Sequence, residues 1–133
     1  MKFETQLQKV IQRNSNVTSY RFNRPDGFEY KPGQFLNVTL KHNEKELSKY
    51  LSFSSSPTEH THIEFTKKLS DSEFSDALRN VKHGDCAKID APYGKFTFEG
   101  EYPKIALLGG GIGITPFMSI CKYATDKGLN NKI

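Results

Sequence analysis

Apolar and polar residues alternate along much of the first hundred residues, which is the period of a half-buried β-strand. In the run Leu36 to Leu40 every second side chain is apolar, and in the run Ile63 to Lys67 apolar residues alternate with Glu64 and Thr66. We therefore expect one face of each strand in a core and the other face in solvent. The pattern predicts strands at residues 3 to 13, 17 to 23, 34 to 41, 50 to 54, 61 to 67 and 86 to 91. Short strands separated by turn residues are typical of a small antiparallel barrel or sandwich.

One short helix interrupts the predicted strands. Ser70 and Glu73 have the spacing of a capping box, in which a serine hydroxyl and a glutamate satisfy the first free amides of a helix. The apolar residues that follow share one helical face and are Phe74, Ala77, Leu78 and Val81.

A cluster of glycines follows the apolar segment Ile105 to Leu108, which we expect to be a strand. The cluster consists of Gly109, Gly110, Gly111 and Gly113. Glycines let a backbone approach a phosphate closely, and the amides of a following helix N-terminus favour an anion. The third glycine position of the usual dinucleotide fingerprint is Ile114 here, so a simple tight turn remains an alternative.

A second helix is expected directly after the glycines. Thr115 is the predicted N-cap, Pro116 the first helical residue and Gly128 the residue after the last turn. Its apolar positions are Phe117, Ile120, Cys121 and Ala124. We place a domain boundary near residue 100, giving a barrel at 1–100 and a strand-helix unit at 101–133. One such unit cannot cover both faces of a sheet, so the α/β part is incomplete, and its apolar helix predicts packing on the barrel or a homo-oligomer.

Composition narrows the chemistry that the chain can perform. The 133 residues are 35% hydrophobic and 26% charged, as in ordinary soluble domains. Two cysteines give neither a disulfide framework nor an iron-sulfur ligand set, so any electron chemistry needs an organic cofactor. The net charge of +4 comes from scattered lysines, which disfavours nucleic-acid binding.

The remaining sequence features concern location and metal binding. The N-terminus has no apolar run, so we expect no signal peptide, no membrane span and a cytoplasmic location. His60, His62 and Glu64 have the spacing of one strand face and could in principle bind a metal, but a solvated strand face is the favoured interpretation and no metal site is predicted.

Five sequence landmarks in order resemble the ferredoxin-NADP reductase superfamily of flavoproteins. They are Pro32-Gly33-Gln34-Phe35, Lys49-Tyr50-Leu51-Ser52, Phe65-Thr66-Lys67, Ser72-Glu73-Phe74-Ser75 and the glycine turn. The resemblance covers nearly the whole chain. It implies a mainly β fold, a small antiparallel Greek-key β-barrel of the FAD-binding type followed by the start of an NAD(P)-binding domain.

The resemblance also implies site residues. Lys49 would pair with the flavin pyrophosphate, Tyr50 or Leu51 would pack on the flavin, and the catalytic Ser52 hydroxyl would approach its N5 atom. Lysine and leucine stand where the family has arginine and tyrosine, so the bidentate fork and the aromatic ring are lost. The remaining residues implied for FAD are Phe65, Thr66, Lys67, Ser72, Glu73, Phe74 and Ser75, and those implied for NAD(P)H are Gly110, Gly111, Ile112, Gly113 and Thr115.

Two hypotheses about function follow. In the first, the chain is the flavin-binding portion of an NAD(P)H-dependent oxidoreductase that passes hydride to FAD and electrons to an unidentified acceptor. In the second, the departures at Lys49 and Leu51 indicate a non-catalytic barrel module that acts as an interaction or regulatory subunit. Retention of flavin separates the two.

Overall fold

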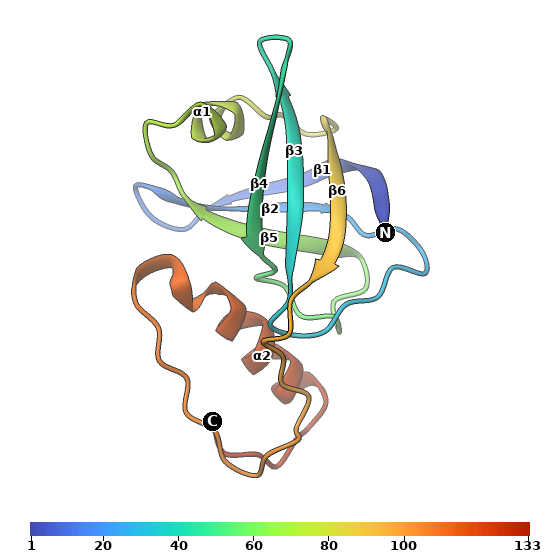
Figure 1. Ribbon diagram of the computed structural model, residues 1–133, viewed down its shortest axis with the longest axis vertical. Helices are drawn as coiled ribbons and strands as arrows, with labels where there is room; N and C mark the ends of the chain where they lie inside the picture. The colour runs from blue at the N-terminus through green and yellow to red at the C-terminus, as the bar shows by residue number, and fades with distance from the viewer.

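A six-stranded antiparallel sheet curls into a half-barrel that forms the body of the molecule (Figure 1). The computed structural model describes residues 1–133. The strands follow the order β4-β3-β6-β1-β2-β5, and β4, β3 and β6 cross in front of β1, β2 and β5. The elements are β1 (Lys2–Gln12), β2 (Val17–Asn23), β3 (Phe35–His42), β4 (Lys45–Ser52), β5 (His62–Lys68), α1 (Glu73–Arg79), β6 (Cys86–Tyr93), the 3₁₀ turn η1 (Gly111–Ile114) and α2 (Thr115–Asp126).

The core lies on the concave side of this half-barrel. The alternating side chains of β3 are buried as expected, with Leu36 at 1% and Val38 at 0% exposure. Aromatic rings fill the centre, and the Tyr30 and Phe53 rings stack with their centroids 4.0 Å apart. The mainly β barrel expected from the sequence is therefore confirmed.

Gly33 fixes the approach of the loop before β3 to a later segment. Its φ is +103°, which favours glycine, and a Cβ placed there would lie 2.0 Å from the Phe96 carbonyl oxygen. Glycine is thus required in the predicted Pro32-Gly33 turn for two reasons, its backbone conformation and the lack of room for a side chain.

Two strand predictions need correction. The strand expected at 50–54 begins at Lys45, because β4 forms a hairpin with β3 that the mostly polar segment did not indicate. The face of β5 expected in solvent is buried, with Glu64 at 4% and Thr66 at 6% exposure. Ser54 after β4, Arg13 after β1 and Arg21 of β2 contact Glu64 on that face, so β5 is enclosed on both sides.

The predicted capping arrangements are also wrong in detail. Ser72, not Ser70, caps α1, and its hydroxyl accepts a hydrogen bond from the Ser75 amide at 3.1 Å. Thr115 is the first residue of α2 rather than its cap, because η1 runs directly into the helix from Ile114.

The buried face of α2 also differs from the expected one. It contains Thr115, Ser119, Ile120 and Ala124, whereas Cys121 is exposed, so the buried side includes small polar residues that the apolar pattern did not indicate. No helix in the structure is long and apolar enough to cross a membrane.

The segment from Ile105 to Leu108 does not form the predicted strand. One parallel bridge, between Lys104 and Lys132, is its only sheet-like pairing. A β-strand needs a hydrogen-bonded neighbour along its length. The segment around Lys132 is the only neighbour here, and it supplies a single bridge. Leu108 is consequently 93% exposed.

Candidate functional site

The half-barrel is open between its two edge strands, β4 and β5. One bridge, Phe53 to Phe65, joins these strands, and the Ser54 amide donates to the Glu64 carbonyl at 2.8 Å beside it. Away from this bridge the strands diverge, and α1 lies beside β4 (Figure 1). We call the opening between β4 and β5 the seam.

Strand alternation decides which predicted residues face the seam. Lys49 pairs in register with the fully buried Val38, and Leu51 pairs with Leu36, so both project to the concave side. Leu51 packs against the core from the edge of the sheet. The lysine charge and an apolar surface therefore stand side by side on β4.

A second lysine approaches Lys49 from β5. Burial lowers the pKa of Lys67, and the positive charge of Lys49 lowers it further. Lys67 donates a hydrogen bond to the Lys68 carbonyl at 2.8 Å, and neither Lys49 nor Lys67 forms an ion pair. Two neighbouring cations without a carboxylate partner can donate charge-assisted hydrogen bonds to a phosphate or pyrophosphate.

The start of α1 presents fewer free amides than the sequence suggested. The Ser75 amide is bonded to the Ser72 hydroxyl, and the buried Ser75 hydroxyl accepts from the Ser70 amide at 3.0 Å. The Glu73 and Phe74 amides keep no partner in the protein. Ser72 has an ordinary φ of −71°, so its backbone is free of strain at the start of the helix.

The other predicted flavin residues are dispersed. Tyr50 lies on the convex face, is 61% exposed and contacts the Phe35 ring edge-on at 5.8 Å. Ser52 lies on the same face of β4, half-buried and in register with Phe35. The Phe65 side chain belongs to the core, where it stacks on Tyr20 at 5.5 Å. Only the backbone of Phe65 can therefore face a ligand.

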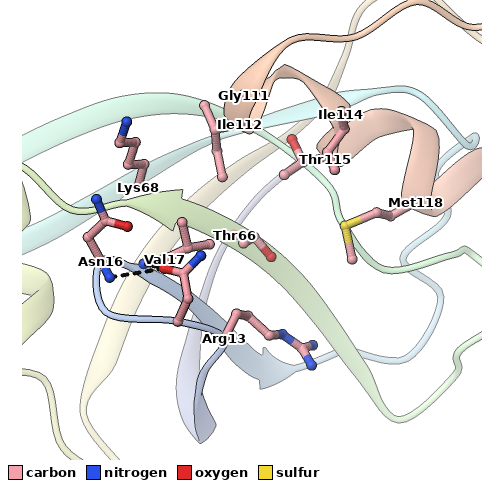
Figure 2. Close-up of a pocket in the computed structure, with 11 residues that line it drawn as sticks. Arg13, Asn16, Val17, Thr66, Lys68, Gly111, Ile112, Ile114, Thr115 and Met118 are labelled. Atoms are coloured by element: carbon pink, nitrogen blue, oxygen red, sulfur yellow. Dashed lines mark hydrogen bonds between the residues drawn. The ribbon is translucent and has the colours of Figure 1, made fainter.

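The glycine turn lines a separate pocket of about 570 Å³ against the outer face of β5. Of the residues predicted for a nicotinamide nucleotide, Gly111, Ile112 and Thr115 line it, whereas Gly110 and Gly113 do not. Gly111 adopts a φ of +56°, which turns the chain into η1. Figure 2 shows Ile112 and Thr115 on one side of the pocket and Val17, Asn16 and Arg13 on the other. The complete lining consists of Arg13, Asn14, Asn16, Val17, Thr66, Lys68, Gly111, Ile112, Ile114, Thr115 and Met118.

A buried polar network under this pocket was not predicted. The Glu64 carboxylate accepts from Ser54 at 2.6 Å and from Arg21 at 2.8 Å. The Ser54 hydroxyl accepts from Thr66 at 2.9 Å, and Thr66 contacts Ser19 at 2.7 Å. Arg21 lies opposite Glu64 in the β2–β5 register, so the pairing of those strands is the signal that would have revealed the network.

The open antiparallel half-barrel has the architecture of the flavin-binding barrels of the ferredoxin reductase-like superfamily. The chain belongs to the oxidoreductase FAD-binding domain family, whose model matches residues 4–98. The resemblance found in the sequence is thereby confirmed.

Curated relatives include two reductase components of oxygenases. The chain is 29% identical to the reductase component of propane 2-monooxygenase from Rhodococcus jostii, over 97% of this chain and 36% of that protein. It is 33% identical to the ferredoxin reductase component of 3-ketosteroid-9-alpha-monooxygenase from Mycolicibacterium smegmatis, over 98% of this chain and 40% of that protein. The chain therefore spans less than half the length of these relatives.

Solved structures share the fold. A ferredoxin NADP+ reductase from Neisseria gonorrhoeae, with bound FAD and NADP, superposes with a TM-score of 0.80 at 20% identity, over 96% of this chain and 53% of that one. The flavohem-like FAD/NAD binding domain of nitric oxide dioxygenase from Vibrio cholerae superposes with a TM-score of 0.80 at 25% identity, over 93% and 57% of the two chains.

Proposed function

We propose that this chain is the FAD-holding portion of an NAD(P)H-dependent reductase and that FAD binds along the seam between β4 and β5. The observation that carries the proposal is the pair Lys49 and Lys67, two mutually repelling cations with no carboxylate partner, at the open edge of a barrel whose family binds FAD. The residues present fit the group, because the seam offers charge for its pyrophosphate and an apolar wall for its ring.

Each residue has a stated task in this proposal. Lys49 and Lys67 neutralise the pyrophosphate, and the free amides of Glu73 and Phe74 add donors at the start of α1. Leu51 supplies apolar surface in place of an aromatic ring. Ser52 ends β4 next to the bridge, with its side chain on the opposite face of the strand from Leu51. When bound, FAD accepts hydride and releases electrons singly or in pairs, so the protein orients reactants and excludes water.

The glycine-turn pocket is the proposed site of the nicotinamide nucleotide. This proposal is supported by Gly111, Ile112 and Thr115, which together form one wall of the pocket. That wall faces Thr66 and Lys68 of β5. Gly110 and Gly113 lie beside the residues of this wall in the same turn but do not line the pocket. The electron acceptor of the full-length protein is proposed to be an oxygenase component, because the reductases of propane and ketosteroid monooxygenases are relatives.

An absorption spectrum after incubation with FAD and desalting tests the flavin proposal. We expect a yellow protein with flavin bands, and chromatography of the heat-released cofactor should identify FAD. A colourless protein that retains neither FAD nor FMN would contradict the proposal. It would support the second candidate, a non-catalytic barrel module, which is favoured by the packing of Leu51 against the core instead of an exposed ring.

A further inference from the structure

Glu64 of β5 is bonded at three places to the serine segment that follows β4. Its carboxylate accepts from the Ser54 hydroxyl at 2.6 Å, and its carbonyl accepts from the Ser54 amide at 2.8 Å. Its own amide donates to the Ser55 hydroxyl at 2.9 Å. Glu64 is buried and precedes Phe65, whose bridge to Phe53 closes the seam. The buried carboxylate therefore stands at the closed end of the proposed flavin site, and the tasks assigned above do not use it.

A chain of hydroxyl groups ends on the same carboxylate, and its direction is fixed. Arg13 can only donate, so the Ser19 hydroxyl accepts from its Nε at 3.0 Å. The Thr66 hydroxyl donates to Ser54 at 2.9 Å, so it accepts in its 2.7 Å contact with Ser19. The Ser54 hydroxyl in turn donates to Glu64. Each hydroxyl thus donates once and accepts once, and every donor along the chain points toward the carboxylate.

This chain is closed to water at its centre and open at its cationic ends. Its three hydroxyl-bearing residues are all buried. Arg21 pairs with the Glu64 carboxylate at 2.8 Å and Arg13 lies 3.6 Å from it, but these two side chains remain 26% and 40% exposed. The buried part of the network therefore depends on one charge, that of Glu64, whereas both guanidinium groups keep access to solvent.

The anchored serines lie where β4 stops and the seam begins. The bridge between Phe53 and Phe65 is antiparallel, so two residues away from it Leu51 and Lys67 stand on opposite sides of the opening. Both residues belong to the proposed flavin site. Because β4 and β5 are the two edges of the sheet, no ladder of hydrogen bonds holds them together along the seam. The junction at the bridge therefore sets the width of the seam.

We propose that Glu64 is a positioning residue, whose buried carboxylate holds Ser54 against β5 and so sets the width of the seam that receives the flavin. This role rests on the proposed function and deepens it, since it names a residue that orients the flavin without contacting it. A glutamine side chain has one acceptor oxygen where Glu64 uses two, so either Ser54 or Arg21 would face an NH₂ donor. Glu64→Gln should therefore loosen the end of β4 while the arginines stay hydrated.

Visible circular dichroism of bound FAD tests this role on the full chain, because the signal depends on how the protein holds the flavin ring. Glu64→Gln and Ser54→Ala should each bind FAD about fivefold to tenfold more weakly and change the visible spectrum of the FAD that is bound. Ser48→Ala is the matched control and should change neither, because the Ser48 hydroxyl contacts Thr39 at an exposed position of β4. Ser54→Ala keeps the ion pair of Glu64 with Arg21, so it tests the role even if Glu64→Gln does not fold.

A contribution to stability alone would lower the urea midpoint of both variants and leave the affinity for FAD and its visible spectrum unchanged. That result would overturn the positioning role. Amide hydrogen exchange of the flavin-free chain separates it from a failure of the proposed function. If the natural chain retains no FAD, the proposed function fails, and Glu64 still holds the end of β4 if exchange at residues 51–56 is faster in both variants than in Ser48→Ala. Unchanged exchange there in both variants contradicts the role of Glu64 whether or not FAD binds.

Discussion

At the scale of single residues, the seam depends on a lysine where related barrels use arginine. A lysine ammonium is a point charge with three donors, whereas a guanidinium binds two phosphate oxygens in parallel. Lys49 projects from the edge strand with no carboxylate partner. Under the proposed function, its charge is therefore available to the FAD pyrophosphate and contributes no ion pair to the folded protein.

Lys49→Ala is expected to weaken FAD binding about tenfold to a hundredfold, because a charge-assisted phosphate contact contributes about 1.5–3 kcal/mol. Lys49→Arg should bind several-fold more tightly than the natural chain because it restores a bidentate contact. Quenching of flavin fluorescence on titration measures both changes. Lys9→Ala provides the control, and equal dissociation constants for the alanine variants would show that Lys49 does not contact the cofactor.

Gly33 gives a second prediction at this scale, about stability. A side chain at Gly33 meets both an unfavourable φ of +103° and the Phe96 carbonyl, whereas Gly27 has a φ of +78° and open space around it. Gly27→Ala should cost about 1–2 kcal/mol, the usual penalty of a left-handed alanine. Gly33→Ala should cost at least about 3 kcal/mol, because backbone must move as well. Urea unfolding of both variants measures the difference, and similar midpoints would contradict the close approach.

At the scale of elements, the enclosure of β5 on both faces has a pH-dependent consequence. Burial of His62, reinforced by the positive charge of Arg21 and of Arg24, lowers its pKa below the ordinary value. The carboxylates of Glu59 and Glu64 oppose this shift, and each has a smaller effect on the pKa than burial or Arg21 but a larger one than Arg24. The folded protein therefore resists protonation of His62 at a pH where the unfolded chain accepts the proton.

The free energy of unfolding should consequently fall as the pH drops below about 6.5, the ordinary pKa of histidine. Above that pH the His62 ring is neutral in both the folded and the unfolded protein, so His62 does not make the free energy of unfolding depend on pH. His62→Gln should reduce the decrease in urea midpoint between pH 7.5 and pH 5.5, and His60→Gln, at an exposed position before β5, should not. An unchanged decrease in the His62→Gln protein would contradict the shift.

The elements also show which features a sequence can predict. Alternation in Leu36 to Leu40 predicted a half-buried strand because burial there depends on residues two apart in one segment. The burial of Glu64 depends on Arg21 and Ser54, which reach it from two other segments, so alternation alone assigned it to solvent. The start of β4 was missed for a related reason, because an edge strand exposed to water carries little apolar periodicity.

In the candidate site, too, features that depend on neighbouring residues were predicted from the sequence, whereas features that depend on contacts between distant segments were not. The motif at Lys49 to Ser52 was recognisable from its order in the chain, but its relation to Lys67 required the folded half-barrel. Arg13 was not singled out because nothing near it in sequence resembles a binding motif. It reaches the glycine-turn pocket only because β1, β2 and β5 pair side by side.

At the scale of the whole molecule, α2 is attached to the half-barrel by one buried face. Ile120 is 1% exposed, the Phe117 ring lies 6.1 Å from the Phe96 ring, and Thr58 donates a hydrogen bond to Asp126 near the end of the helix. The segment before the helix has one bridge and no strand, and its residues Ile105 to Leu108 line an apolar pocket together with Phe117 and Ile120. The position of the glycine turn against β5 therefore depends on how firmly α2 is packed.

Ile120→Ala should accordingly loosen α2 while leaving the sheet intact. Truncating a fully buried isoleucine costs about 2–4 kcal/mol. Ile120 lies outside the core cluster of the barrel, so this cost falls on the packing of α2. Amide hydrogen exchange over 115–126 should accelerate, whereas exchange in β1 to β6 should stay slow. The affinity for nicotinamide mononucleotide should also fall, because the wall of the glycine-turn pocket that η1 and α2 form would move. Cys121→Ala, on the exposed side of the same helix, should change none of these. If Ile120→Ala instead accelerates exchange equally in helix and sheet, the half-barrel and α2 unfold as one unit, and the pocket is as stable as the core beneath it.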